Sequence, residues 1–140
     1  AVCITVGGGM QQGKVIGDVT ETDGLRFAAN AINKNNAMEQ YGVILSETVA
    51  NPDGDPPIYG GGISPSDSVF FSFSGFPPEW DQAFCLMIAE YFGIISPQRV
   101  NSIIEQSKDP LKARVYHHEA RAFIMFYILH VGLHGNDSDV

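Results

Sequence analysis

The chain has 140 residues, of which 44% are hydrophobic and 17% are charged, and its formal net charge is −8. This length and composition are typical of one globular domain, which we expect to span residues 1–140, and they exclude a disordered protein. The eight Lys and Arg residues are scattered along an acidic chain, so we expect that no nucleic acid binds.

The hydrophobic segments are too short for a membrane protein. The nearest candidate, residues 122–133, falls short of the ~18 uninterrupted apolar residues that a transmembrane helix needs. The chain does not open on a basic stretch followed by a long apolar one, so we expect a cytoplasmic protein without a membrane partner. Cys3 and Cys85 each lie in an apolar run and are predicted to be buried free thiols, with a disulfide between them as the alternative.

The beginning of the chain is predicted to form strands around one helix. Residues 2–6 are β-branched and predict a strand, and residues 14–20 alternate well enough for a short strand or hairpin arm. Residues 20–40 carry apolar side chains at helical spacing, with Thr22 or Asp23 as the N-cap, and predict a helix.

The middle of the chain repeats this alternation of strand and helix. Residues 41–49 predict a strand, and residues 50–67, with four prolines and four glycines, predict a long irregular loop. Residues 68–76 predict another strand. Residues 78–93 predict a strong helix, because proline stands in its first turn and two acidic residues lie at its positive end.

The conformation of residues 98–106 decides between two folds. If the second half of the chain copies the first, this segment is a strand and Ser96 lies at a corner before it. The alternative is a short helix from Ser96 that places Val100, Ile103 and Ile104 on one face. Periodicity alone favours neither.

Residues 110–134 form a C-terminal extension that is predicted as either helix or strand. Its first part favours a helix, whereas the aromatic run that follows is as β-prone as any in the chain. Each large apolar side chain contributes about 1.5–3 kcal/mol on burial, so this segment requires a covering surface. In an oligomer, it could pack across a neighbouring subunit.

One stretch resembles a known family. Residues 85–100, "CLMIAEYFGIISPQRV", are similar to the second helix and following corner of the tautomerase superfamily, in particular its branch similar to macrophage migration inhibitory factor. The order of the other elements in residues 1–106 also fits that family.

The resemblance implies an α+β fold of two βαβ units that form a four-stranded sheet with two helices packed on one face. On this interpretation residues 1–106 are the tautomerase-like core, residues 99–106 are a strand, and residues 107–140 are a C-terminal extension. The resemblance also implies a homotrimer, which would cover the sheet edge and residues 122–133.

The family's site residues carry over poorly. Its members use an N-terminal proline as the base in keto–enol tautomerisation, whereas this chain has Ala1, whose N-terminal amine is the candidate catalytic group. The family's basic residue falls near Ala37, with Lys34 as the closest candidate in sequence. Its Tyr-x-Asn pair falls on Asn101 and Ile103, so Asn101 is the third candidate.

Other motifs are weaker. Residues 8–14 fit the G-x-x-x-x-G-K pattern of a phosphate-binding loop, but Val15 stands where a magnesium-binding Ser or Thr is needed, so a turn between hairpin arms is the better interpretation. His130 and His134 have the spacing of a zinc-binding helix face, yet two histidines do not make a site, and residues 117–119 lie too far along a helix to join them.

We therefore expect no metal and no cofactor. Residues 51–57 and 136–139 are acidic and polar, but Pro56 occupies the turn position that a calcium loop gives to glycine. Cys85 lies on an apolar helix face, where a thiol is inert.

Three functions stay open at this point. The first is a tautomerase with weak or absent keto–enol activity on small keto acids, because Ala1 replaces the catalytic proline. The second is a small acidic, non-enzymatic binding or regulatory protein of the same fold that acts through its oligomer surface. The third is an unrelated acidic module that binds a basic partner. The departures at the family's site positions favour the second over the first.

Overall fold

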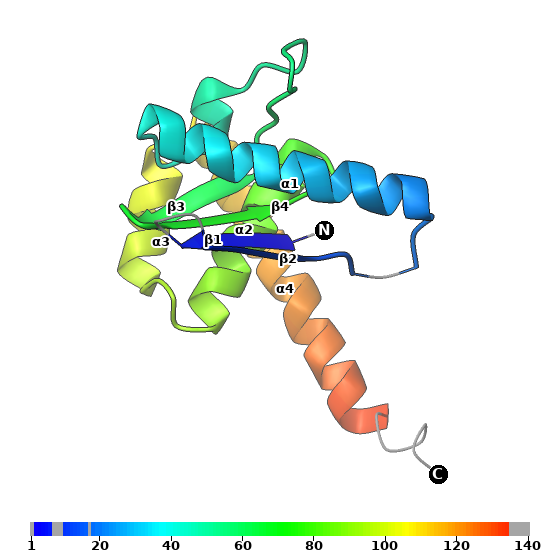
Figure 1. Ribbon diagram of the computed structural model, residues 1–140. Coiled ribbons are helices and arrows are strands. Elements are labelled where there is room, and N and C mark those ends of the chain that lie inside the picture. The colour runs from blue at the N-terminus through cyan, green and yellow to red at the C-terminus, as the bar shows by residue number, and fades with distance from the viewer. Residues whose placement is uncertain (1, 7–9, 17, 135–140) are drawn as a thin grey trace.

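The computed structural model describes residues 2–6, 10–16 and 18–134, and within them the chain forms one antiparallel sheet with helices on both faces (Figure 1). The strand order is β2-β1-β4-β3, and every pairing is antiparallel. The strands are β1 (Val2–Val6), β2 (Met10–Lys14), β3 (Gly62–Ser66) and β4 (Val69–Phe73).

The α+β class is confirmed, but the predicted βαβ units are wrong. A βαβ unit needs parallel strands joined by a long crossover. Here Asp67 and Ser68 alone separate β3 from β4, and residues 7–9 separate β1 from β2, so each pair is antiparallel. The central pair, β1 with β4, is also antiparallel, with Val2 opposite Phe73.

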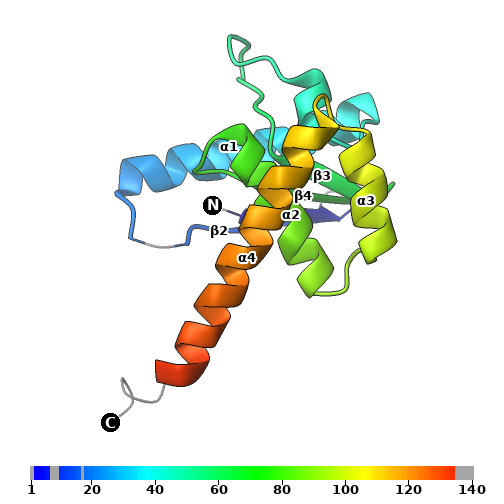
Figure 2. The same cartoon turned by 180° about the vertical axis from the view of Figure 1, so that it is seen from behind.

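The helices lie on opposite faces of the sheet, so the prediction of two helices on one face is also wrong. Helix α1 (Glu21–Tyr41) covers one face, and α2, α3 and α4 lie on the other, as Figures 1 and 2 show. The reason is that β4 is apolar or buried on both sides. The remaining elements are η1 (Ser46–Val49), α2 (Pro78–Tyr91), α3 (Pro97–Glu105) and α4 (Pro110–His134).

Alternate residues of β4 contact the two helical layers. The Ser72 hydroxyl donates to the carbonyl oxygen of Ala31 in α1, at 2.7 Å. Phe71 points to the other face, where it joins the main hydrophobic core formed by α2, α3 and the sheet. That core contains Leu45, Ile63, Phe71, Cys85, Leu86, Ala89, Ile95, Val100, Ile103 and Ile104.

Residues 97–105 form a helix, so the predicted strand at 99–106 is wrong and the alternative helix from Ser96 is right. The Ser96 hydroxyl caps it by accepting from the backbone N–H of Arg99 at 3.1 Å, and Pro97 occupies the first turn. Val100, Ile103 and Ile104 are buried on one face. Capping chemistry and a helical stripe together outweigh the apparent repeat of the first half.

The predicted helices 20–40 and 78–93 and the predicted strand 68–76 are confirmed by α1, α2 and β4. The predicted strand 41–49 is wrong, because α1 continues to Tyr41 and ends at Gly42, whose φ of 63° is left-handed.

Smaller corrections concern caps and ends of elements. Thr20 caps α1, through its hydroxyl to the N–H of Asp23, rather than a residue inside the helix. The predicted loop 50–67 contains β3, and the second strand is Met10–Lys14 rather than 14–20. The C-terminal extension, for which helix and strand were both open, is the helix α4.

We predict that Ile103→Ala lowers the free energy of unfolding by about 2–5 kcal/mol, because the side chain is fully buried and its loss leaves a cavity. Ile94→Ala is the matched control, because Ile94 is 41% exposed and its truncation leaves no enclosed void. Urea unfolding followed by circular dichroism measures both. Equal losses in the two variants would contradict the packing of α3 against the core.

Candidate functional site

A pocket of about 220 Å³ opens where the N-terminal half of α1 meets the segment before β3 and the β4–α2 connection. Three of its nine lining residues are aromatic, and its floor is polar. The lining residues are Phe27, Asn30, Lys34, Tyr59, Ser74, Gly75, Phe76, Pro78 and Asp81.

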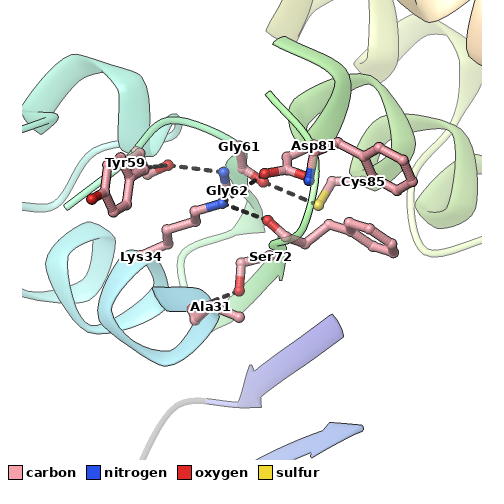
Figure 3. Close-up of polar contacts among 11 residues, drawn as sticks. Ala31, Lys34, Tyr59, Gly61, Gly62, Ser72, Asp81 and Cys85 are labelled. Carbon is pink, nitrogen blue, oxygen red and sulfur yellow. Dashed lines mark hydrogen bonds and ion pairs between the residues drawn. The ribbon is translucent and has the colours of Figure 1, made fainter. Parts of the chain in front are cut away.

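The floor of the pocket is a buried ion pair. The Lys34 side chain is 1% exposed, and its Nζ lies 3.2 Å from Oδ2 of Asp81. The same amine donates to the carbonyl oxygen of Phe73 at the end of β4, as Figure 3 shows. The other Asp81 oxygen, Oδ1, accepts from the backbone N–H of Phe76 at 3.1 Å. Both charged groups are therefore partnered without water.

The local sequence explains how Asp81 reaches this position. Pro77 and Pro78 cannot donate to a sheet ladder, so β4 ends and α2 begins with proline in its first turn. Asp81 follows in that same turn. From there its carboxylate reaches back to Phe76 and across to Lys34, which projects from the middle of α1.

Gly61 allows the pair to form. A Cβ at this position would lie 2.5 Å from Cβ of Asp81 and 2.9 Å from Nζ of Lys34, and the φ of 112° disfavours any other residue. The Gly61 carbonyl oxygen accepts from Sγ of Cys85 at 3.2 Å, which holds the segment against α2 (Figure 3).

Ser46 fixes the neighbouring backbone and with it Tyr59. Its Oγ donates to the carbonyl oxygen of Tyr59 at 2.9 Å and accepts from the N–H of Gly62 at 2.8 Å. Ser46 itself is fully buried in η1. The wall of the pocket that carries Tyr59 is therefore held by a side chain outside the pocket.

Burial controls the ionisation of all three buried groups at this site. Desolvation lowers the pKa of Lys34, against the attraction of Asp81. Desolvation raises the pKa of Asp81 to about 6, although Lys34 and the Phe76 N–H both oppose the change. Burial also raises the pKa of Cys85 far above its usual value, so this thiol is not a nucleophile, as its sequence context predicted.

Of the three predicted catalytic residues the structure describes two, Lys34 and Asn101, and it does not bring these two together. Ala1 lies outside the described residues, so the role of its amine stays a prediction. Lys34 is at the floor of the pocket. Asn101 is exposed on α3, where its side-chain oxygen accepts from Arg114 at 3.3 Å, and it does not line the pocket.

The other sequence motifs do not form sites in the part of the chain that is described. Residues 10–14 of the G-x-x-x-x-G-K pattern are strand β2, paired with β1, and no helix follows them directly, since α1 begins at Glu21. Among the described residues, no group of three or more His, Cys, Asp or Glu is placed to hold a metal ion. Residues 136–139 and the side chains of Cys3 and His134 are outside the described part.

Within the described residues, no helix has the length and apolar character needed to cross a membrane. Comparison with protein-family models, curated proteins and solved structures gave no match for this chain. The resemblance to the tautomerase superfamily therefore stays a prediction.

Sequence reasoning missed Asp81 as a site residue. In the sequence, Asp81 stands out only as one of two acidic residues that favour the start of a helix. The signal that could have found it is the pair of prolines after an apolar strand, because a carboxylate in the next turn is placed at the end of the sheet.

We predict that Lys34→Met lowers the free energy of unfolding by about 3–5 kcal/mol, because it leaves the Asp81 carboxylate buried without its cation. Lys112→Met is the matched control. Lys112 also pairs with a carboxylate, Glu79, at 3.3 Å, but this pair is solvent-exposed, so little change is expected. Urea unfolding at neutral pH compares the two, and similar losses would contradict a special role for the buried pair.

A second prediction concerns pH. The pKa of Asp81 is raised from 3.8 to about 6 on folding, so its contribution to stability is fully present below pH 3.8 and is lost as the pH rises through 6. Relative to Asp81→Asn, the unfolding free energy of the native protein should therefore fall by about 2–3 kcal/mol across this range. Parallel pH curves for the two proteins would show that the carboxylate is not desolvated.

Proposed function

We propose that this protein binds a small, planar, electrically neutral compound in the pocket between α1 and the start of α2. The observation that carries the proposal is the ion pair of Lys34 and Asp81, whose opposite charges cancel, at the floor of a pocket with aromatic walls. The proposal corresponds to a binding protein rather than an enzyme.

The walls favour a flat ligand. Phe27 of α1, Tyr59 before β3 and Phe76 after β4 come from three separate segments and line the same space. Aromatic rings contribute large contact area and prefer stacked or edge-to-face partners, which planar compounds provide. The volume of about 220 Å³ lies below that of a pocket for a drug-sized compound, so the ligand is small.

The floor favours a neutral ligand with hydrogen-bonding groups. The charges of Lys34 and Asp81 offset each other, and the half-buried side chain of Asn30 carries both a donor and an acceptor group. A charged ligand would lose its hydration without gaining an unpaired counter-charge. A ligand whose edge carries an amide, or a similar pair of donor and acceptor groups, is the best complement to this floor.

The same contacts argue against covalent catalysis here. The Lys34 amine is engaged by the carbonyl oxygen of Phe73 and by Asp81, and a nucleophilic amine must be free of both. The Cys85 thiol is buried behind Gly61. Tautomerase activity at the amine of Ala1 stays a separate prediction, because Ala1 lies outside the described residues.

We predict that neutral planar probes bind at this pocket. Nicotinamide, benzamide and uracil, added at millimolar concentration, should shift the backbone amide signals of residues 27–34 and 74–76 in two-dimensional NMR spectra. Nicotinate and benzylamine, which are similar in shape but charged, should show at least tenfold weaker affinity when the same signals are followed in a titration, which corresponds to about 1.4 kcal/mol.

Two tryptophan variants locate the binding. Asn30→Trp fills the pocket and should abolish the shifts, whereas Asn33→Trp, at a half-buried asparagine one turn further along α1, should not, because Asn33 does not line the pocket. If none of the neutral probes shifts these signals, or if the two variants respond alike, the proposal is wrong.

A further inference from the structure

Helix α4 leaves the body of the protein halfway along its length. It has 25 residues, and its first half packs against α2, with Ala120 fully buried. Figures 1 and 2 both show its C-terminal part extending away from the sheet and the other helices. We call residues 122–130 the projecting segment.

The projecting segment is apolar around its circumference. Phe123 is 60% exposed, Met125 54%, Phe126 71% and Tyr127 58%. At about 100° per residue these positions are spread around the helix rather than gathered on one face. A helix that is apolar all round is normally buried, and residues 122–130 contain no Asp, Glu, Lys or Arg.

A groove of about 240 Å³ lies at the base of this segment, between α2 and α4. Its two charged groups pair with each other, because Oε1 of Glu90 lies 3.9 Å from Nη1 of Arg121. Tyr91 at its rim is 67% exposed. The lining residues are Met87, Glu90, Tyr91, Arg121, Ile124 and Met125.

We propose that a second copy of this chain covers both surfaces, with the two α4 helices side by side and antiparallel. Because α4 is itself one wall of the groove, antiparallel pairing places the projecting segment of each copy beside the groove of the other. The contact is then the same in both directions and closes under twofold symmetry. One chain supplies both the apolar helix and the groove that receives it.

The charges are compatible with this pairing. The projecting segment brings no formal charge into the groove, so the Glu90 contacts are covered without a new buried ion. The three basic residues of α4 are each paired within their own chain: Lys112 with Glu79, Arg114 with Glu105 and Arg121 with Glu90. Two α4 helices can therefore lie side by side without bringing unpaired cations together.

The test is the mass of the full chain, measured by light scattering at tens of micromolar. The native protein should have twice the 15.2 kDa mass of the chain. Phe126→Glu should give the mass of a single chain, because it places a charge in the contact. Leu25→Glu is the matched control: Leu25 is also on a helix and is 67% exposed, but it lies on α1 at the other face of the sheet, so this variant should stay dimeric.

Circular dichroism checks that each variant is folded. Each of the following results for the mass would contradict the proposal. A native protein that is monomeric at this concentration overturns it, and flotation of that monomer with phosphatidylcholine vesicles would assign the segment to a lipid surface. A mass of three chains would favour the predicted homotrimer instead. A dimer that survives both Phe126→Glu and Tyr91→Glu would place the interface elsewhere.

Discussion

The ion pair between Lys34 and Asp81 joins the two helical layers of this protein around the end of its sheet. Lys34 comes from α1 on one face, Asp81 comes from α2 on the other, and the amine also binds the last carbonyl of β4. Burial of two charges is unfavourable, as the opposite shifts of their pKa values show. The hydrogen bonds from Phe76 and to Phe73 offset part of that cost and fix one geometry.

Several features of the chain follow from this arrangement. Residue 61 must be glycine, because a Cβ there would overlap with the side chains of Asp81 and Lys34. Cys85 bonds to the carbonyl oxygen of that glycine, and Ser46 bonds to the backbone of Tyr59 and Gly62 on either side of it. The pocket above the pair therefore has walls from three segments. The pocket is thus a consequence of how the two layers are joined.

Aromatic packing connects the pocket with α4. Phe76 lines the pocket and contacts Phe84 in α2, with ring centroids 5.3 Å apart. Trp80 contacts Phe84 at 6.0 Å and Tyr116 of α4 at 4.9 Å. The proposed ligand site and the proposed dimer helix therefore pack on the same side chains of α2, although each proposal has its own test.

Local signals in the sequence predicted several elements correctly. The caps, prolines and apolar spacing of residues 20–40 and 78–93 act within a few residues, so they identify α1 and α2 without tertiary information. The same kind of signal, Ser96 followed by Pro97, is present at α3, but the resemblance to the tautomerase superfamily implied a strand there instead. The predicted direction of the strands was wrong, because strands that pair with each other can lie far apart in the sequence.

The site was predicted only in part, for the same reason. Lys34 was selected from a resemblance and is at the pocket floor, but its partner Asp81 is 47 residues away. No spacing rule joins residues at that distance. The pair could be recognised only once β4 and the two prolines had placed α2 at the end of the sheet.

The most direct test of this account replaces the pair as a whole. The double variant Lys34→Met/Asp81→Leu exchanges both charges for apolar groups of similar length, so it should fold with nearly native stability. It also removes the polar floor of the pocket. Titration with nicotinamide, followed by NMR, should then show at least tenfold weaker binding than in the native protein. Unchanged affinity in the folded double variant would contradict the account, because the pocket would not depend on the pair.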